Sequence, residues 1–86
     1  MELNKVLFQG GESRWNPGEA VDFMVAYVAD PDDPDTVIEL YAEMENPTWD
    51  EDADAFADES YTYDDLKAEI ISQTRENGID PESLVF

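Results

Sequence analysis

The sequence of 86 residues contains no cysteine and no histidine, and only four of its side chains are cationic. Without cysteine there is no disulfide framework, zinc ribbon or thiol chemistry. Without histidine the commonest general base and the commonest metal ligand are both missing. We therefore expect a protein that is not an enzyme and that binds no cofactor and no metal ion.

The four cations are Lys5, Arg14, Lys67 and Arg75. They cannot build the basic surface that holds phosphate groups or anionic lipid. No apolar run approaches the ~20 residues of a membrane span, and the N-terminus lacks a basic segment followed by a long apolar one. The sequence thus predicts a cytoplasmic protein that binds neither nucleic acid nor membrane directly.

Acidic residues dominate the chain, because 23 Asp and Glu side chains give a formal net charge of −19. Yet 42% of the residues are apolar and 12% are aromatic, in periodic runs that argue against a disordered acidic tail. A small domain has a thin core, so self-repulsion of this size costs stability. We expect the charge to serve a purpose.

The hydrophobic pattern predicts one domain over residues 1–86, with strands at residues 3–8, 20–29 and 36–45. In the third strand apolar residues alternate strictly with polar ones, and three of the polar ones are Glu39, Glu43 and Glu45. One face of this strand is therefore expected to be buried and the other to be rich in carboxylates.

Two helices are expected after these strands. Thr48 and Glu51 have the spacing of a capping box, which predicts a short helix to about Asp58. A second start at Thr62 opens a longer helix that ends at Asn77-Gly78, where glycine suits the left-handed position. The expected fold is α+β, a three-stranded antiparallel sheet with two helices packed mainly on one face.

The acidic residues after Pro47 match four ligand positions of an EF-hand loop, at Asp50, Asp52, Asp54 and Asp58. The glycine of that loop is replaced by Ala55, and the bidentate glutamate by Tyr61. A specific calcium site is therefore not expected. Catalysis by paired carboxylates is disfavoured as well, because it needs a cleft that so short a chain can hardly supply.

Mimicry of nucleic acid explains the acidity better. Side chains on one face of a strand recur every ~6.8 Å, a spacing comparable to that of successive phosphates along one strand of nucleic acid. Aromatic residues among the acids are candidate anchors at an interface. The expected partner-binding surface combines the polar face of the third strand with the acids of the first expected helix: Glu39, Tyr41, Glu43, Glu45, Asp50, Glu51, Asp54 and Asp58.

In its size, its charge and its acidic stretches from Asp30 to Asp35 and from Asp50 to Glu59, the chain resembles the small acidic inhibitors that phages and mobile elements encode. Anti-CRISPR and anti-restriction proteins belong to this class. The resemblance implies a nucleic-acid mimic that acts in the cytoplasm of the host cell. Its partner would be a basic nucleic-acid-binding protein, such as a CRISPR effector, restriction enzyme or nuclease, blocked by stoichiometric binding.

Two alternatives stay open. The chain could be a small soluble protein of the haloarchaeal type, whose acidity is an adaptation to salt. It could also be an acidic immunity protein or an antitoxin, since such proteins have a similar length and bind similar partners. The placement of charge separates the first alternative from mimicry. An inhibitor should gather its carboxylates on one side, whereas salt adaptation should distribute them.

Overall fold

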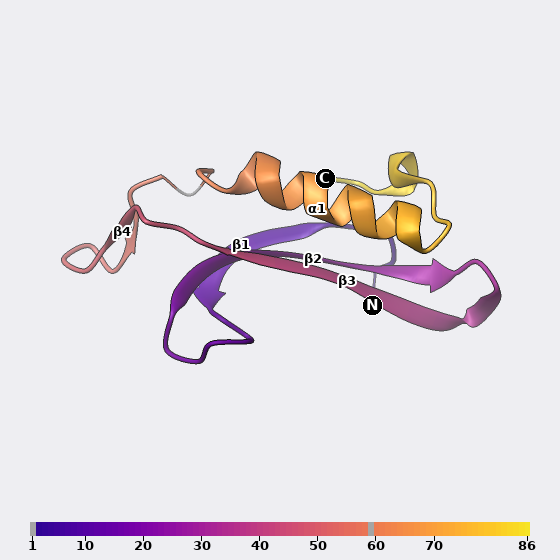
Figure 1. Cartoon of the computed structure of the whole chain (residues 1–86), viewed down its shortest axis with the longest axis horizontal. Coiled ribbons are helices and arrows are strands. Elements are labelled where there is room, and N and C mark those ends of the chain that lie inside the picture. The colour runs from indigo at the N-terminus through magenta and orange to yellow at the C-terminus, as the bar shows by residue number, and fades with distance from the viewer. Residues whose placement is uncertain (1, 59) are drawn as a thin grey trace.

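The computed structural model describes residues 2–58 and 60–86. Its centre is a three-stranded antiparallel sheet in the order β1, β2, β3. The strands are β1 (Leu7–Glu12), β2 (Ala20–Asp30) and β3 (Asp33–Glu45). Helix α1 (Tyr63–Glu76) lies across one face of this sheet, and the short 3-10 helix η1 (Pro81–Ser83) follows it (Figure 1).

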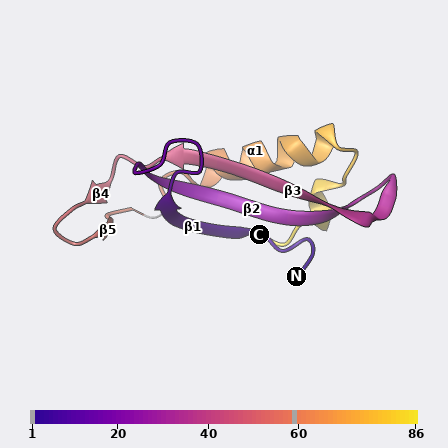
Figure 2. The same cartoon turned by 90° about the horizontal axis from the view of Figure 1, so that it is seen from below.

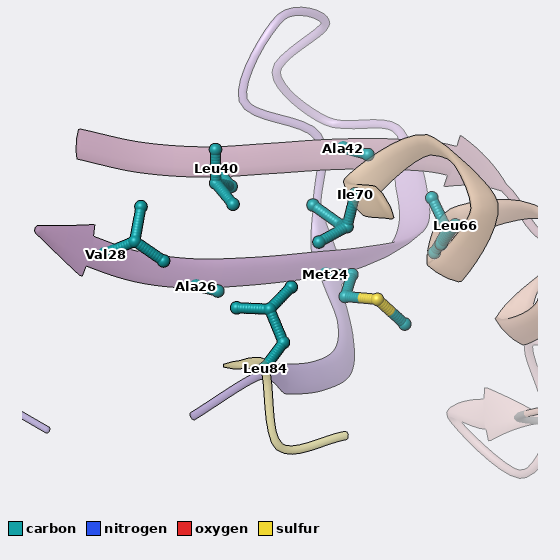
Figure 3. Close-up of a cluster of buried hydrophobic side chains, with 8 residues drawn as sticks. All are labelled: Met24, Ala26, Val28, Leu40, Ala42, Leu66, Ile70 and Leu84. Carbon is teal, nitrogen blue, oxygen red and sulfur yellow. The ribbon is translucent and has the colours of Figure 1, made fainter. Parts of the chain in front are cut away.

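The core lies between α1 and the face of the sheet that the helix covers. The register pairs Met24 with Ala42 and Ala26 with Leu40, so the apolar positions of β2 and β3 share this face. Eight buried side chains from the sheet, the helix and the C-terminal segment meet there (Figure 3): Met24, Ala26, Val28, Leu40, Ala42, Leu66, Ile70 and Leu84. The alternation in β3 thus places Leu40 and Ala42 in the core as predicted, whereas Met44, near the end of the strand, is exposed.

Helix α1 ends as the sequence predicts. Gly78 has a φ of 72°, and its N–H donates to the carbonyl of Arg75 at 3.2 Å. The N–H of Ile79 donates to the carbonyl of Thr74 at 2.8 Å, which completes a Schellman motif. Ile79 packs against the core and so fixes the exit of the chain from the helix.

The expected two-helix arrangement is wrong, because the residues from Thr48 to Asp58 form a hairpin and not a helix. The hairpin consists of β4 (Trp49–Asp50) and β5 (Ala55–Phe56), which pair antiparallel at one end of the molecule (Figure 1). The described residues therefore contain one α-helix and a 3-10 turn beside the three-stranded sheet.

Turn chemistry overrides the helical pattern in this segment. Asp50 Oδ1 accepts the N–H of Asp52 at 3.0 Å, and Asp54 adopts the left-handed region with a φ of 51°. Short polar side chains favour such turns over helices because they bind nearby backbone groups. Trp49 and Phe56 face each other across the hairpin and pack with ring centroids 4.9 Å apart.

Strand β1 begins at Leu7, beyond most of the expected strand at residues 3–8, and runs through Gly10. A glycine is needed there, because a Cβ atom at Gly10 would lie 2.5 Å from Phe56 Cε2. The hairpin therefore reaches back onto β1.

The C-terminal segment lies beside the N-terminal one, where Lys5 and Val85 form a parallel bridge (Figure 2). None of the helices in the described ranges has the length and apolarity that crossing a membrane requires.

Candidate functional site

The loop between β1 and β2 (residues 13–19) folds back under the face of the sheet opposite α1 (Figure 1). The buried hydroxyl of Ser13 donates to Glu43 Oε2, and the backbone N–H of Arg14 donates to Glu43 Oε1 at 2.9 Å. The hydroxyl of Tyr41 donates to the same Oε1 atom at 3.0 Å. Glu43 is thus the acceptor that fastens the loop to β3.

Arg14 lies over the same part of the strand. Its Nη1 atom is 2.6 Å from Glu39 Oε1, and its Cζ atom lies 3.8 Å from the centre of the Tyr41 ring. The hydroxyl of Tyr27 donates to the other oxygen of Glu39 at 2.9 Å. An ion pair and a cation–π contact therefore act together at one arginine.

Trp15 completes the contact between the loop and the strand. Its ring packs edge-on against Tyr41 with centroids 5.4 Å apart, while Phe23 stacks beside Tyr41 at 5.9 Å. Trp15 is nevertheless 63% exposed. A large aromatic surface that is held in place and open to solvent is the type of side chain that anchors protein interfaces.

These contacts shift the pKa values of the carboxyl groups involved. The hydrogen bond from Arg14, together with that from Tyr27, lowers the pKa of Glu39. Burial raises the pKa of Glu43, but the hydrogen bonds from Ser13, the Arg14 backbone and Tyr41 outweigh it, so the net shift is downward. Hydrogen bonds from the loop and from the two tyrosines therefore favour the charged form of both carboxyl groups.

The structure brings together three of the predicted partner-binding residues, Glu39, Tyr41 and Glu43, but beneath the loop. Tyr41 and Glu43 are half-buried, and Glu39 is exposed but paired. The period of the strand predicts which residues share a face and not what covers that face. Glu45 is exposed beside Glu19, whose pKa is raised by a hydrogen bond with Glu45 and by repulsion from its charge.

The remaining predicted residues are exposed in or just after the hairpin: Asp50, Glu51, Asp54 and Asp58. The first expected helix, which would have carried them, is absent, because this segment forms a hairpin. The acidic turn from Asp30 to Asp35 lies at the opposite end of a molecule that measures 47 × 22 × 20 Å (Figure 1). The two acidic stretches therefore do not merge into one patch.

A second acidic surface, which the sequence analysis missed, lies where α1 borders β3. Trp15, Glu43, Met44, Asp65 and Glu69 contribute to the lining of a shallow hollow of about 330 Å³, and we call these five residues the α1–β3 flank. Met44 is 38% exposed, so the flank places two apolar side chains among three carboxylates. The i, i+4 spacing of Asp65 and Glu69 was the available signal.

Few of the carboxylates are neutralised by cations. Two ion pairs occur among the described residues, Lys5 with Glu2 at 3.6 Å and Arg14 with Glu39. Lys67 lies over the ring of Phe86, with 4.8 Å between Nζ and the ring centre. Most of the net charge of −19 is therefore presented to solvent.

Among the residues that the structure describes, Asp22 alone has a buried carboxylate. Asp22 is 1% exposed, and its Oδ2 atom accepts hydrogen bonds from Asn46 Nδ2 and Thr62 Oγ1, both at 2.7 Å. Asn46 also donates to the carbonyl of Asp58 at 2.9 Å, which ties the end of the hairpin to the sheet. Sequence patterning missed this cluster because its three members are separated by up to 40 positions in the chain.

Similarity to known proteins gives no indication of the function of this chain, so a proposal has to rest on the geometry of these surfaces. Comparison with protein-family models, with curated proteins and with solved structures found no match.

Proposed function

We propose that this protein is a nucleic-acid mimic that inhibits a host-defence protein, such as a CRISPR effector, restriction enzyme or nuclease. It would bind stoichiometrically in the positively charged site where that protein normally holds nucleic acid. The partner supplies the cations that the chain itself lacks. The protein would act in the cytoplasm and carry out no catalysis.

The observation that supports this proposal most is the density of charge along an elongated body. Division of the 47 Å length by the net charge of −19 gives about 2.5 Å per charge. Duplex DNA carries one charge per ~1.7 Å of its axis. A rod of this charge density can follow a channel that is shaped for a duplex (Figure 1).

The α1–β3 flank is the most suitable centre for such an interface. Charge steers association, but buried aromatic anchors supply most of the affinity in protein complexes. On the flank, Trp15 and Met44 offer apolar surface beside Asp65 and Glu69. The loop that carries Trp15 is fixed to Glu43, so little ordering is required when the partner binds.

The test has two steps. Capture from a nuclease-treated host lysate would identify the partner, and displacement of a labelled duplex from the purified partner would measure inhibition. We expect displacement to saturate at one molecule of this protein per nucleic-acid site and to weaken as salt rises. Binding in which duplex and protein occupy the partner together would contradict the proposal.

Charge reversal on the flank provides the decisive comparison. Asp65→Lys with Glu69→Lys should weaken displacement by at least about tenfold, since each reversal replaces attraction by repulsion. Glu76→Lys with Glu82→Lys changes the net charge equally at exposed sites that do not line the hollow. Equal losses for the two double variants would indicate diffuse attraction rather than an ordered interface.

Adaptation to high salt is the second candidate function, and the distribution of acidic turns over both ends favours it. The salt dependence of folding separates the two. A nucleic-acid mimic should unfold cooperatively in about 50 mM salt and gain modest stability as screening increases. A chain that stays unfolded below about 1 M salt would instead identify its acidity as halophilic adaptation.

A further inference from the structure

We infer that the hollow between the β4–β5 hairpin and the end of β1 is a binding site for an arginine side chain. The hollow measures about 710 Å³, a size within the range of small-molecule sites in proteins. Apolar and aromatic side chains from β1, the start of β2 and the hairpin form its walls: Phe8, Ala20, Trp49, Ala55 and Phe56. This inference rests on the proposed function for its source of arginine, a basic partner.

The buried carboxylate of Asp22 marks the inner side of this hollow. Its two hydrogen bonds, from Asn46 and Thr62, both reach Oδ2. The other oxygen, Oδ1, lies 3.3 Å from the position that a Cβ atom of Gly10 would take, and both residues line the hollow. The ring of Phe56 lies over Gly10, with its Cε2 atom 2.5 Å from the same Cβ position, so a ligand would reach this carboxylate along the Phe56 ring.

Exposed carboxylates contribute to the outer lining. Glu12, Glu19 and Asp54 also line the hollow, and they come from β1, the β1–β2 loop and the hairpin. Among the residues that the structure describes, no three acidic side chains converge closely enough to hold a metal ion. Dispersed carboxylates around aromatic walls suit an extended organic cation better than a compact inorganic one.

The combination of aromatic walls and carboxylates in this hollow favours a guanidinium group over an ammonium group. A guanidinium group is planar and weakly hydrated, stacks on aromatic rings and binds carboxylates through paired N–H groups. Trp49 and Phe56 supply the rings, and their mutual contact holds them in place at 4.9 Å between centroids. The apolar stem of arginine would lie along Ala55 while its head reaches toward Asp22.

The probe for this site is N-acetyl-arginine amide, titrated into the isotope-labelled protein at constant ionic strength. We expect saturable changes in the amide signals of Gly10 and Ala55 and in the indole signal of Trp49, with an affinity in the millimolar range. N-acetyl-citrulline amide has nearly the same shape without the charge, and it should bind about tenfold more weakly or not at all.

Two variants locate the binding without disturbing Asp22, whose replacement could unfold the chain. Ala55→Leu fills the hollow and should weaken binding of the arginine probe at least about fivefold. Asp54→Asn removes a lining charge at a left-handed position that asparagine tolerates. Asp52→Asn is its matched control, because Asp52 is exposed in the same turn and does not line the hollow.

Three results would overturn the inference. Changes spread over the acidic surface, with equal effects of Asp54→Asn and Asp52→Asn, would mean general charge attraction. Equal binding of the citrulline probe would mean an apolar hollow without selection for charge. Equal binding of N-acetyl-lysine amide would remove the assignment to guanidinium. The titration contains no partner protein, so its failure would leave the displacement test of the proposed function intact.

Discussion

Gln73 of α1 holds both backbone groups of Tyr41 at the outer edge of β3. Its Nε2 atom donates to the Tyr41 carbonyl at 2.8 Å, and its Oε1 atom accepts the Tyr41 N–H at 3.1 Å. An edge strand otherwise offers such groups to any other strand. Tyr41 is therefore fixed from the edge by the helix, and from the face opposite α1 by Arg14 and Trp15 of the loop.

Replacement of Gln73 by alanine should lower the free energy of unfolding by about 1 kcal/mol, since water replaces both lost hydrogen bonds at a half-exposed site. The amide of Tyr41 should also exchange its hydrogen faster. Urea unfolding and hydrogen exchange measure the two effects. Ser72→Ala, at the exposed neighbouring position, is the control and should change stability by less than about 0.5 kcal/mol. Unchanged exchange at Tyr41 would speak against the contact.

The buried cluster around Asp22 predicts a difference between two identical substitutions. Thr62→Val removes a hydrogen bond to a buried carboxylate and should cost about 2 kcal/mol. Thr36→Val removes a bond of 2.8 Å from an exposed threonine to Asp33 and should cost less than about 0.5 kcal/mol. Thermal or urea unfolding compares them. Similar costs at both positions would mean that Asp22 does not depend on Thr62.

Stability should pass through a maximum in mildly acidic solution. The pKa of Glu19 is raised beside Glu45, so protonation of Glu19 relieves repulsion and stability rises as the pH falls through that raised pKa. The pKa values of Glu39 and Glu43 are lowered, so their contribution is present above the ordinary glutamate pKa of 4.5 and is lost as the pH falls through their lowered values. Urea unfolding across this pH range, at constant ionic strength, measures the profile.

Two variants assign the limbs of that profile. At pH values above the maximum, Glu45→Gln should make the free energy of unfolding depend less on pH, because Glu19 loses its charged neighbour. At pH values below the maximum, Glu43→Gln should make the loss of stability with falling pH less steep, because the acceptor that fastens the loop no longer titrates. Both assignments would be refuted if the unchanged protein and the two variants all lost stability steadily as the pH falls from neutral.

Close packing between Gly10 and Phe56 predicts that the hairpin is sensitive to a single methyl group. Gly10→Ala would force Phe56 to move, and the hairpin should loosen from β1. The N–H of Ala57, which donates to the Thr48 carbonyl at 2.9 Å, should then exchange faster. Gly11→Ala is the control, because its Cβ would meet Phe23 at 3.3 Å and leave the hairpin untouched. Equal exchange in both variants would exclude this coupling.

The sequence predicted those elements whose local signals agree with each other. For α1, the start after Thr62 and the glycine at its end mark the same helix. In the hairpin segment the signals conflict, because the spacing of Trp49 and Phe56 suits both one face of a helix and a pair across two strands. The Asx turn at Asp50 favours the hairpin over the helix, and the pattern of apolar residues contains no signal for this turn.

The candidate site was less predictable, because its contacts join distant parts of the chain. The acids of β3 were assigned correctly to one face, yet the loop residue that binds Glu43 through its backbone lies 29 positions away. Gln73 and Tyr41 are 32 positions apart. Periodicity reports on neighbours within one element, whereas these contacts depend on how the loop and the helix return to the sheet.

Arg14 limits how acidic this chain can become. Acidic replacements at Lys5 or Arg75, both exposed, would raise the charge density with little structural consequence. The same change at Arg14 would place a third carboxylate against Glu39 and Glu43 and release Trp15 from its support. Selection for greater negative charge therefore has to retain this cation. Among sequence variants of this protein, Arg14 should be the last of the four cations to be replaced.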